Sequence, residues 1–442
     1  MKIIIALLLF GIIVFIHELG HFLLAKANGV KVTEFAIGMG PKLFSFERGE
    51  TVYAIKLLPL GGSCMMLGED EASDDERAFD NKSVWARFSV VFAGPFFNFI
   101  LAFVLAIVLI ALVGADRPVV MQVEKDSPAA EAGLLPGDYI SEYNGYHIGV
   151  GREIYIADYF KPVGDAPVSI QYKRDGKVHE TTLTPKKVSK YLLGMGYSDD
   201  SKPASISVSE GGALEEAGLK NGDVIVKIND QEISSGSAFA EYVTSHPLSA
   251  EKVQVTYERN GKEKTVTVSP QKSESYTTGF TYNCNYGAVD DSENPYLGNE
   301  KVSVLGNLKY SLLEVRYQIK TVMMSLKHLV TGKVSADSVA GPVGIVNMVG
   351  DVYSESAQYG LLAIFESLAS FCIMLSANLG VMNLLPIPAL DGGRLLFMIV
   401  EIVRGKKISA DKEGFVHFIG FVLLMVLMVV VMFNDIRNIF IK

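Results

Sequence analysis

The chain has 442 residues, of which 49% are hydrophobic and 20% are charged. A soluble domain is usually about one quarter charged, so the apolar excess makes a membrane protein the first class to test. The net charge of −9 argues against a nucleic-acid-binding protein. The three cysteines are scattered and form no C-x-x-C pair, which argues against a disulfide framework and against a thiolate zinc site.

Four stretches are long and apolar enough to cross a bilayer, which takes about 20 residues. They cover residues 3–25, 88–113, 359–385 and 415–433. The fourth holds one polar side chain, His417, for which a packed or interfacial position is favoured over metal binding. The first stretch also loosely fits a signal peptide cleaved near Ala27, an alternative that would discard the motif at its end. The fold class predicted is a polytopic α-helical membrane protein with four transmembrane helices.

Residues 114–358, between the second and third spans, contain an internal repeat. Residues 130–145 and 215–230 align at an offset of 85 and are identical at eight of sixteen positions, and 173–185 aligns with 258–270 at the same offset. Each copy reads as a short helix, a Gly-Asp turn, an alternating strand and a final hairpin. The pattern resembles the permuted PDZ domain of bacterial envelope proteases. A β-rich pair without a peptide groove is the alternative.

Residues 271–300 are rich in polar residues and are expected to be a linker. Residues 303–331 then carry apolar side chains near helical spacing, interleaved with lysines and an arginine. A helix on the membrane surface and a helix packed on a domain fit this segment equally well. The expected domains are 1–113 with two spans, 114–200 and 201–272 as PDZ-like domains, 273–358 as linker and amphipathic helix, and 359–442 with two spans.

The first span contains His17-Glu18-Leu19-Gly20-His21, which has the form H-E-x-x-H. Residues i and i+4 share one face of a helix, so both imidazoles can reach one metal ion while Glu18 stands beside it. Neutral imidazole is a typical zinc ligand, and a catalytic zinc keeps an open position for a water that a Glu can deprotonate. The alternative is that these residues lie among the lipid headgroups and end the helix.

A third ligand is expected after the third span, where Asp391 stands alone in an apolar stretch. A carboxylate in such surroundings needs a counter-charge, which zinc would supply. Pro386 and Pro388 break the helix, and Gly392-Gly393 allows the backbone to approach another helix closely. The alternative for Asp391 is the N-cap of a helix that starts near Gly392.

Three segments together resemble the site-2 protease family of intramembrane zinc proteases: HELGH in the first span, AGPFFNF at 93–99 and NLLPIPALDGG at 383–393. With paired PDZ-like repeats between the second and third spans, the chain looks like the bacterial regulator-of-sigma-E-protease (RseP) branch. The resemblance implies a set of site residues, namely the zinc ligands His17, His21 and Asp391, the catalytic base Glu18, and the substrate-binding Asn378 and Asn383.

Residues 38–67 read as a β-hairpin, with a turn at Glu47-Arg48-Gly49-Glu50 followed by the alternating segment 51–57. In the family this hairpin dips into the membrane beside the active site. An exposed strand edge there would replace the backbone hydrogen bonds that a substrate helix loses when it unwinds. A plain cytosolic hairpin is the alternative.

Lysine and arginine are concentrated in the loop 394–412, which should therefore be cytoplasmic. Four spans then place 26–83 in the cytoplasm and both termini and the repeats outside. HELGH and Asp391 fall toward the cytoplasmic side on facing helices. The expected location is the bacterial cell (inner) membrane, crossed several times.

The sequence thus predicts a zinc-dependent intramembrane endopeptidase that cuts transmembrane segments of single-span membrane proteins, such as an anti-sigma factor or remnant signal peptides. Expected partners are those substrates, membrane lipids and peptide C-termini at the PDZ-like domains. One alternative is a membrane-anchored PDZ scaffold with a structural or inactive metal site, which a closed four-ligand site would favour. A metal transporter is a third class, but too few polar residues lie in the spans to line a path.

Overall fold

The structure is a computed structural model that describes residues 2–69, 73–197, 203–284, 286, 302–333, 340–357, 359–408 and 410–441. Its internal contacts divide the chain into two compact units. The helical unit comprises residues 1–121, 146–160 and 282–442, and the repeat unit comprises 122–145 and 161–281. Each unit is described by itself.

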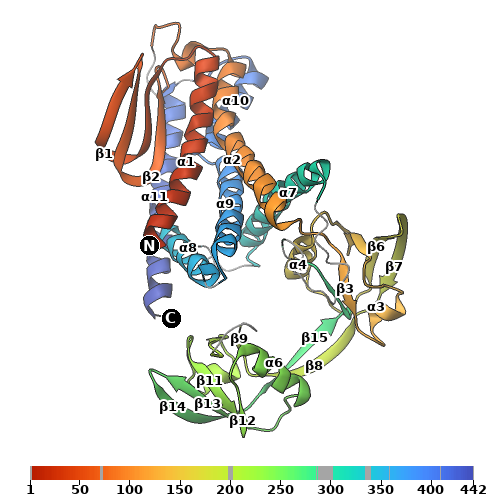
Figure 1. The fold of residues 1–442 in the computed structure, drawn as a ribbon. Coiled ribbons are helices and arrows are strands. Elements are labelled where there is room, and N and C mark those ends of the chain that lie inside the picture. The colour runs from red at the N-terminus through yellow and green to blue at the C-terminus, as the bar shows by residue number, and fades with distance from the viewer. Residues whose placement is uncertain are drawn as a thin grey trace. The chain divides into compact units, whose positions relative to one another are not determined.

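Among the described residues of the helical unit, four helices are long and apolar enough to cross a membrane. They are α1 (Lys2–Ala27), α2 (Val84–Val113), α9 (Leu361–Asn383) and α11 (Ala410–Ile441), in which the apolar part is Lys412–Arg437. Each coincides with a predicted span. Helix α2 packs against both α1 and α9, as Figure 1 shows. It begins four residues before the apolar run because the hydroxyl of Ser83 caps it, accepting from the Ala86 N–H at 3.3 Å.

The predicted hairpin is formed by strands β1 (Val32–Arg48) and β2 (Thr51–Met66). Arg48 pairs with Thr51 across the expected turn. Residues 34–37 pair with 52–55 on one side and with 62–65 on the other, so β1 and β2 fold back on themselves and form a wider sheet than a simple hairpin. The hairpin starts earlier than predicted because 32–36 is mostly buried and joins a core shared with α1, α2 and α10. Phe35 stands at its centre, with the ring of Phe22 at 5.2 Å and that of Phe15 at 5.9 Å. The base of the hairpin is therefore fixed to the helices that carry the H-E-x-x-H motif.

The helical unit also contains shorter or non-spanning elements. They are η1 (Phe79–Asn81), β5 (Tyr146–His147), α4 (Arg152–Phe160), α7 (Val304–Val330), α8 (Pro342–Ala357) and α10 (Asp391–Arg404). Helix α10 packs on α2, while α8 packs on α1, α9 and α11.

Helix α7 confirms the predicted helix at 303–331 and packs on α2, α9 and α4. Its buried side is largely polar and includes Asn307, Ser311, Glu314 and Gln318. Several of its apolar side chains are exposed, among them Leu305, Leu312, Met323 and Val330. Exposing these apolar side chains to water would be unfavourable, so the outer face of α7 is suited to contact with lipid.

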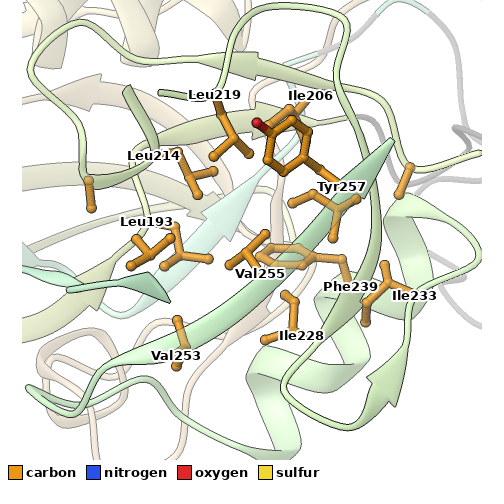
Figure 2. Close-up of a cluster of buried hydrophobic side chains, with 14 residues drawn as sticks. Leu193, Ile206, Leu214, Leu219, Ile228, Ile233, Phe239, Val253, Val255 and Tyr257 are labelled. Atoms are coloured by element: carbon orange, nitrogen blue, oxygen red, sulfur yellow. The ribbon is translucent and has the colours of Figure 1, made fainter. Parts of the chain in front are cut away.

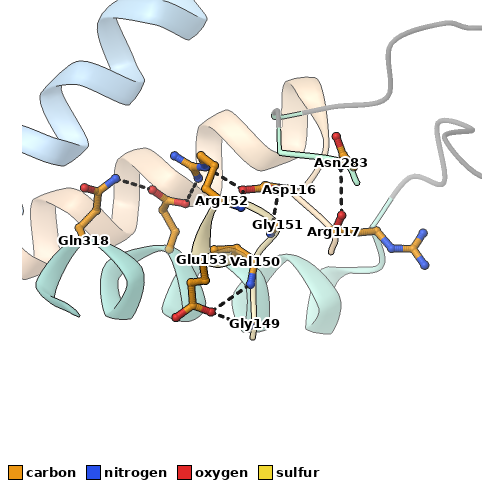
Figure 3. A network of polar contacts seen from close by, with 10 residues as sticks. Asp116, Arg117, Gly149, Val150, Gly151, Arg152, Glu153, Asn283 and Gln318 are labelled. Atoms are coloured by element: carbon orange, nitrogen blue, oxygen red, sulfur yellow. Dashed lines mark hydrogen bonds and ion pairs between the residues drawn. The ribbon is translucent and has the colours of Figure 1, made fainter. Parts of the chain in front are cut away.

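A buried ion network ties α4 to α7 (Figure 3). The Arg152 guanidinium donates to Asp116 Oδ2 at 2.7 Å and to Glu314 Oε2 at 2.5 Å, and both acidic side chains are 1% exposed. Burial raises the pKa of the Asp116 carboxyl, and Arg152 opposes that rise. Glu153 extends the contact, since its Oε1 lies 3.2 Å from Arg316 and 3.1 Å from Lys320. Helix α4 is therefore anchored in the helical unit, although its sequence lies inside the first repeat.

The described part of the repeat unit is built from short strands and three short helices. In chain order they are β3 (Val120–Val123), α3 (Pro128–Glu131), β4 (Tyr139–Tyr143), β6 (Val168–Arg174), β7 (Lys177–Leu183), β8 (Lys186–Leu192), β9 (Met195–Tyr197), β10 (Ile206–Val208), α5 (Ala213–Glu216), β11 (Val224–Ile228), β12 (Gln231–Glu232), α6 (Gly236–Ser245), β13 (Val253–Arg259), β14 (Lys262–Val268), β15 (Gln271–Thr277) and β16 (Phe280–Tyr282). The boundary between the units runs through β3 and β16.

The two repeat copies share the same polar signature at the offset of 85 residues. Arg174 donates to both oxygens of Asp138 at 2.7 Å, and Arg259 donates to those of Asp223 at 2.7 and 2.6 Å. The antiparallel pairs β4–β6–β7 match β11–β13–β14. The repeat inferred from the sequence is therefore a repeat of structure. Figure 2 shows the apolar core of the second copy, centred on Ile228, Phe239 and Val255.

The second copy is inserted between two paired strands. Strand β8 pairs with β15 from Lys186↔Thr277 to Leu192↔Gln271, so the chain leaves and returns at neighbouring positions (Figure 1). Residues 271–282 are thus strands rather than the expected linker, which corrects that part of the sequence interpretation. Most of the remaining expected linker, 287–300, lies outside the described residues.

Candidate metal centre

The two buried histidines of the H-E-x-x-H motif meet the half-buried Asp391. His17 and His21 lie on α1, and Asp391 is the first residue of α10. The Nε2 atoms of the histidines are 3.2 Å apart, and Asp391 Oδ2 is 3.2 Å from that of His17 and 3.5 Å from that of His21. The three residues predicted as ligands are therefore together, although nearly the whole chain separates Asp391 from the motif.

The spacing of these atoms fits a zinc ion. Ligand atoms about 2 Å from a tetrahedral zinc lie about 3.4 Å from one another, close to the three observed distances. Asp391 Oδ2 is buried and, among the described residues, makes no hydrogen bond of regular geometry. A Cβ atom on Gly94 of α2 would lie 2.2 Å from His21 Nε2 and 2.9 Å from His17 Cε1. Glycine at 94 thus keeps open the space that faces both imidazoles.

The second nitrogen of each imidazole is held by α2. His21 Nδ1 lies 2.9 Å from the Val90 carbonyl oxygen, which can only accept, so Nδ1 carries the proton and the Nε2 lone pair is free for the metal. His17 Nδ1 lies 3.1 Å from the side-chain amide of Asn98, and the Ser376 hydroxyl of α9 donates to the backbone carbonyl oxygen of Asn98 at 2.8 Å. An amide turned to present Oδ1 would fix His17 in the same way, and Oδ1 is buried with no partner among the described residues.

Asn98 and Val90 were not predicted as site residues. The signal for Asn98 was present, because it is a lone amide in the apolar second span and it lies in the AGPFFNF segment. Val90 contributes through its backbone, which no side-chain pattern reports. Both belong to α2, so this helix orients the imidazoles that α1 supplies.

Glu18 lies beside the cluster, half-buried, and outside the set of three predicted ligands. A Cβ on Gly62 of β2 would lie 2.6 Å from Glu18 Cγ, so the hairpin backbone packs directly against this side chain. A carboxylate next to two imidazoles, at the edge of a strand, has the position a proton-accepting group needs.

The backbone before Asp391 packs so closely against Gly392 and Gly393 that no residue with a Cβ atom fits at these two positions. A Cβ on Gly392 would lie 2.1 Å from the Leu385 carbonyl oxygen, and one on Gly393 would lie 2.6 Å from that of Ile387. The N-cap of α10 is Leu390, which makes no side-chain capping bond, and Asp391 begins the helix itself. The alternative of Asp391 as an N-cap is therefore wrong.

The two asparagines predicted to contact substrate take different places. Asn378 faces a cavity of about 1370 Å³ that also touches α4, α7, α8 and α11, and Asn383 is the last residue of α9. Within the described part of the chain, neither forms a hydrogen bond to the three ligands. Ser370, Met374 and Met382 line the same cavity at helical spacing, whereas Ser376, on the other side of α9, contacts Asn98. Helix α9 thus separates the cavity from the helix that orients the imidazoles.

The comparisons with known proteins identify the class. A model of Peptidase family M50 matches residues 5–427, and the chain belongs to this family. The zinc metalloprotease RasP of Geobacillus kaustophilus is 36% identical, with 98% of this chain and 97% of the relative covered. The regulator of sigma-W protease RasP of Bacillus subtilis is 34% identical, with 98% of each covered. A putative zinc metalloprotease of Clostridium acetobutylicum is 35% identical, with 98% and 97% covered.

Among solved structures, the HtrA3 PDZ domain bound to a phage-derived ligand covers 20% of this chain at 15% identity. Its TM-score of 0.18 is too low to show a shared fold. The family and its relatives confirm the recognition of a site-2 protease of the RseP type. The chain is a multi-pass membrane protein and a zinc metalloendopeptidase. Within the described residues the cluster of possible metal ligands has three members, the number of protein ligands that catalytic zinc sites typically have. Neither the scaffold nor the transporter alternative is supported.

Proposed function

We propose that this protein cuts the transmembrane segments of single-span membrane proteins within the bilayer. The observation that carries the proposal is the cluster of His17, His21 and Asp391, which joins the first candidate span to the segment that follows the third. Glu18 and a strand edge stand beside that cluster. A protease site built into membrane-spanning helices acts on peptide bonds that lie at the same depth.

In this proposal His17, His21 and Asp391 hold zinc. When bound, zinc acidifies water and polarises the scissile carbonyl. Glu18 accepts the proton of the attacking water and later gives it to the leaving amine. Asn378 or Asn383 steadies the oxyanion or the substrate strand through its amide.

The hairpin supplies a template for the unwound substrate. A helical segment shields its carbonyls by internal hydrogen bonds and resists cleavage until it is extended. Strand β2 touches Glu18 at Gly62, so a substrate strand paired along this edge would run past the catalytic base. The large cavity at Asn378 is where we place the substrate helix before it unwinds, with Ser367 and Ser370 facing it.

Anti-sigma factors and remnant signal peptides are the proposed substrates. The Bacillus subtilis relative carries the name regulator of sigma-W protease, which fits cleavage of a membrane-bound regulator. Peptide C-termini are the proposed ligands of the repeats. A groove of about 570 Å³ between the β8–β9 segment and α6 has the strand and helix walls that such binding uses.

Mapping the cut tests the function directly. The protein is reconstituted in vesicles with a tagged single-span substrate whose outer domain has already been trimmed. The products are then sequenced by mass spectrometry. We expect the cut to fall inside the apolar segment of the substrate. A cut confined to its water-exposed flanks would refute intramembrane proteolysis.

Topology gives a second test. Arg87 lies 2.6 Å from Glu401 and Arg394 lies 2.5 Å from Glu69, so the loop before α2 and the segment around α10 lie on one side. We propose that this side is cytoplasmic and that the repeats are outside. Cys64 lies on the side proposed to be cytoplasmic, but it is buried and a thiol reagent would not reach it. Engineered cysteines at exposed positions are therefore needed to test the topology.

In a Cys284→Ser background, an impermeant thiol reagent should label the Lys262→Cys variant in intact cells. It should label the Glu76→Cys variant only after the membrane is permeabilised. The positions are matched in that both side chains are exposed. Labelling of Glu76→Cys alone in intact cells would invert the topology.

The repeats are proposed to control access of bulky substrates. Deleting 118–270 would remove Arg152 and leave Asp116 and Glu314 as unpaired buried charges, at a cost of about 3–5 kcal/mol. The β8–β15 pair offers a cleaner deletion, in which an Asn-Gly turn replaces 193–270 between the paired residues Leu192 and Gln271.

This variant should keep zinc and cleave a pre-trimmed substrate at the wild-type rate, and it should also cleave an untrimmed one. Both substrates are compared in membranes. Loss of cleavage of the trimmed substrate, with zinc and insertion intact, would show that the second repeat delivers substrate. Unchanged rejection of the untrimmed substrate would place the filter elsewhere.

A further inference from the structure

The loop that leads to Asp391 contains a residue in an unfavourable conformation. Ala389 has φ of +74°, a region that L-residues with a Cβ avoid. Such a conformation persists only where surrounding contacts hold it. Ala389 lies two residues before Asp391, so whatever holds it also sets the start of α10.

One contact that holds Ala389 comes from His417, the polar residue of the fourth span for which the sequence favoured a packed or interfacial position. The Ala389 N–H donates to His417 Nδ1 at 2.9 Å. Because Nδ1 accepts this bond, the imidazole is neutral and carries its proton on Nε2. The side chain is 15% exposed, and its ring lies 5.6 Å from that of Phe397 on α10.

A second contact comes from the same face of α11, one turn further along. A Cβ added to Gly420 would lie 2.4 Å from Pro388 Cβ and 2.5 Å from the Pro388 carbonyl oxygen. The helix backbone and the loop backbone are therefore in direct contact, and only glycine permits this approach. Gly414 on the same helix has nothing within 4 Å of such a Cβ.

We propose that His417 and Gly420 are positioning residues that fix the Pro388–Ala389 loop and thereby hold the Asp391 carboxylate against the two histidines. The inference rests on the proposed role of Asp391 as a zinc ligand. The loop has no slack to absorb a shift, since Gly392 and Gly393 pack against the Leu385 and Ile387 carbonyls. The fourth span thus contributes to the metal site without supplying a ligand.

The glycine pair gives a matched test. Purified Gly420→Ala and Gly414→Ala proteins are challenged with a zinc chelator, and the zinc that remains is measured over time. Displacing a group that orients a ligand typically weakens metal binding about 10–100-fold. We expect Gly420→Ala to fall in that range and Gly414→Ala to behave as the wild type. Equal zinc retention in both variants would overturn the role of Gly420.

The histidine is tested by substitution and conservative rescue. His417→Leu removes the acceptor and should lose zinc about tenfold faster or more. His417→Asn keeps an acceptor oxygen near the position of Nδ1 and should restore most of the retention, which a purely structural role would not predict. Asp391→Ala is the reference: if it loses zinc and His417→Leu does not, the positioning role is wrong while the ligand assignment stands. If Asp391→Ala retains zinc, the proposed site itself fails.

Discussion

A Glu18→Gln variant should bind zinc and insert in the membrane as the wild type does, yet cleave substrate about 10²–10⁴-fold more slowly. The reason is that Glu18 stands beside the three proposed ligands without belonging to them, so its loss removes the proposed proton acceptor and leaves the metal site whole. Glutamine keeps the shape of the side chain that packs against Gly62. Cleavage rates in vesicles and zinc content of the purified protein are measured together.

Glu401→Gln is a suitable control for this experiment. Glu401 is also a carboxylate of the helical unit, but it pairs with Arg87 away from the three ligands. Its replacement should lower stability and leave the rate per folded molecule unchanged. Cleavage by Glu18→Gln at the wild-type rate would refute the assignment of the base.

The second large effect is expected at the ligands. Asp391→Ala and His21→Ala should each be purified with little zinc and be inactive, because a catalytic zinc site with two protein ligands left is weak. Asp391→Asn keeps the size of the side chain but loses its charge, and should retain zinc poorly as well. Metal content is measured by mass spectrometry on protein that has been exposed to a chelator.

Asp435→Asn is the matched control for the aspartate. Asp435 is a buried acid of α11 that accepts from the Gly341 and Gly344 N–H groups at 3.0 and 2.8 Å, at the start of α8. Its loss should weaken the contact of α8 with α11 and leave zinc content intact. Full zinc retention by Asp391→Ala would mean that the third ligand is another residue.

Much of the helical unit could be predicted because its signals are local. A transmembrane span is recognised from about twenty consecutive apolar residues. Two histidines four residues apart on a helix lie on the same face of that helix. Asp391 could be found because a lone acid in apolar surroundings is costly without a partner. What sequence alone could not give is how these pieces meet, which depends on Gly94 and on the packing of α1 against α2.

The sequence interpretation was wrong for the expected linker, where the pairing of distant strands decides the structure and no local sequence pattern does. Strand β15 has the sequence QKSESYT, which lacks the alternation of apolar residues that marks a half-buried strand. It is a strand because it pairs with β8. Helix α7 fits two interpretations equally well from its sequence for a related reason. Several of its polar residues are among the buried ones, which the spacing of apolar positions cannot reveal.

The Arg152 network bears on how the two repeat copies can diverge. The positions that match Arg152 and Glu153 in the second copy are Ser237 and Ala238, which carry no charge. Helix α6 packs within its own domain and contributes Phe239 to the core of that domain, so its sequence is constrained by that domain alone. Helix α4 must remain compatible with α7 as well. Among relatives, substitutions in α4 should therefore be accompanied by changes at Glu314 or Asp116, whereas α6 should vary independently of the membrane helices.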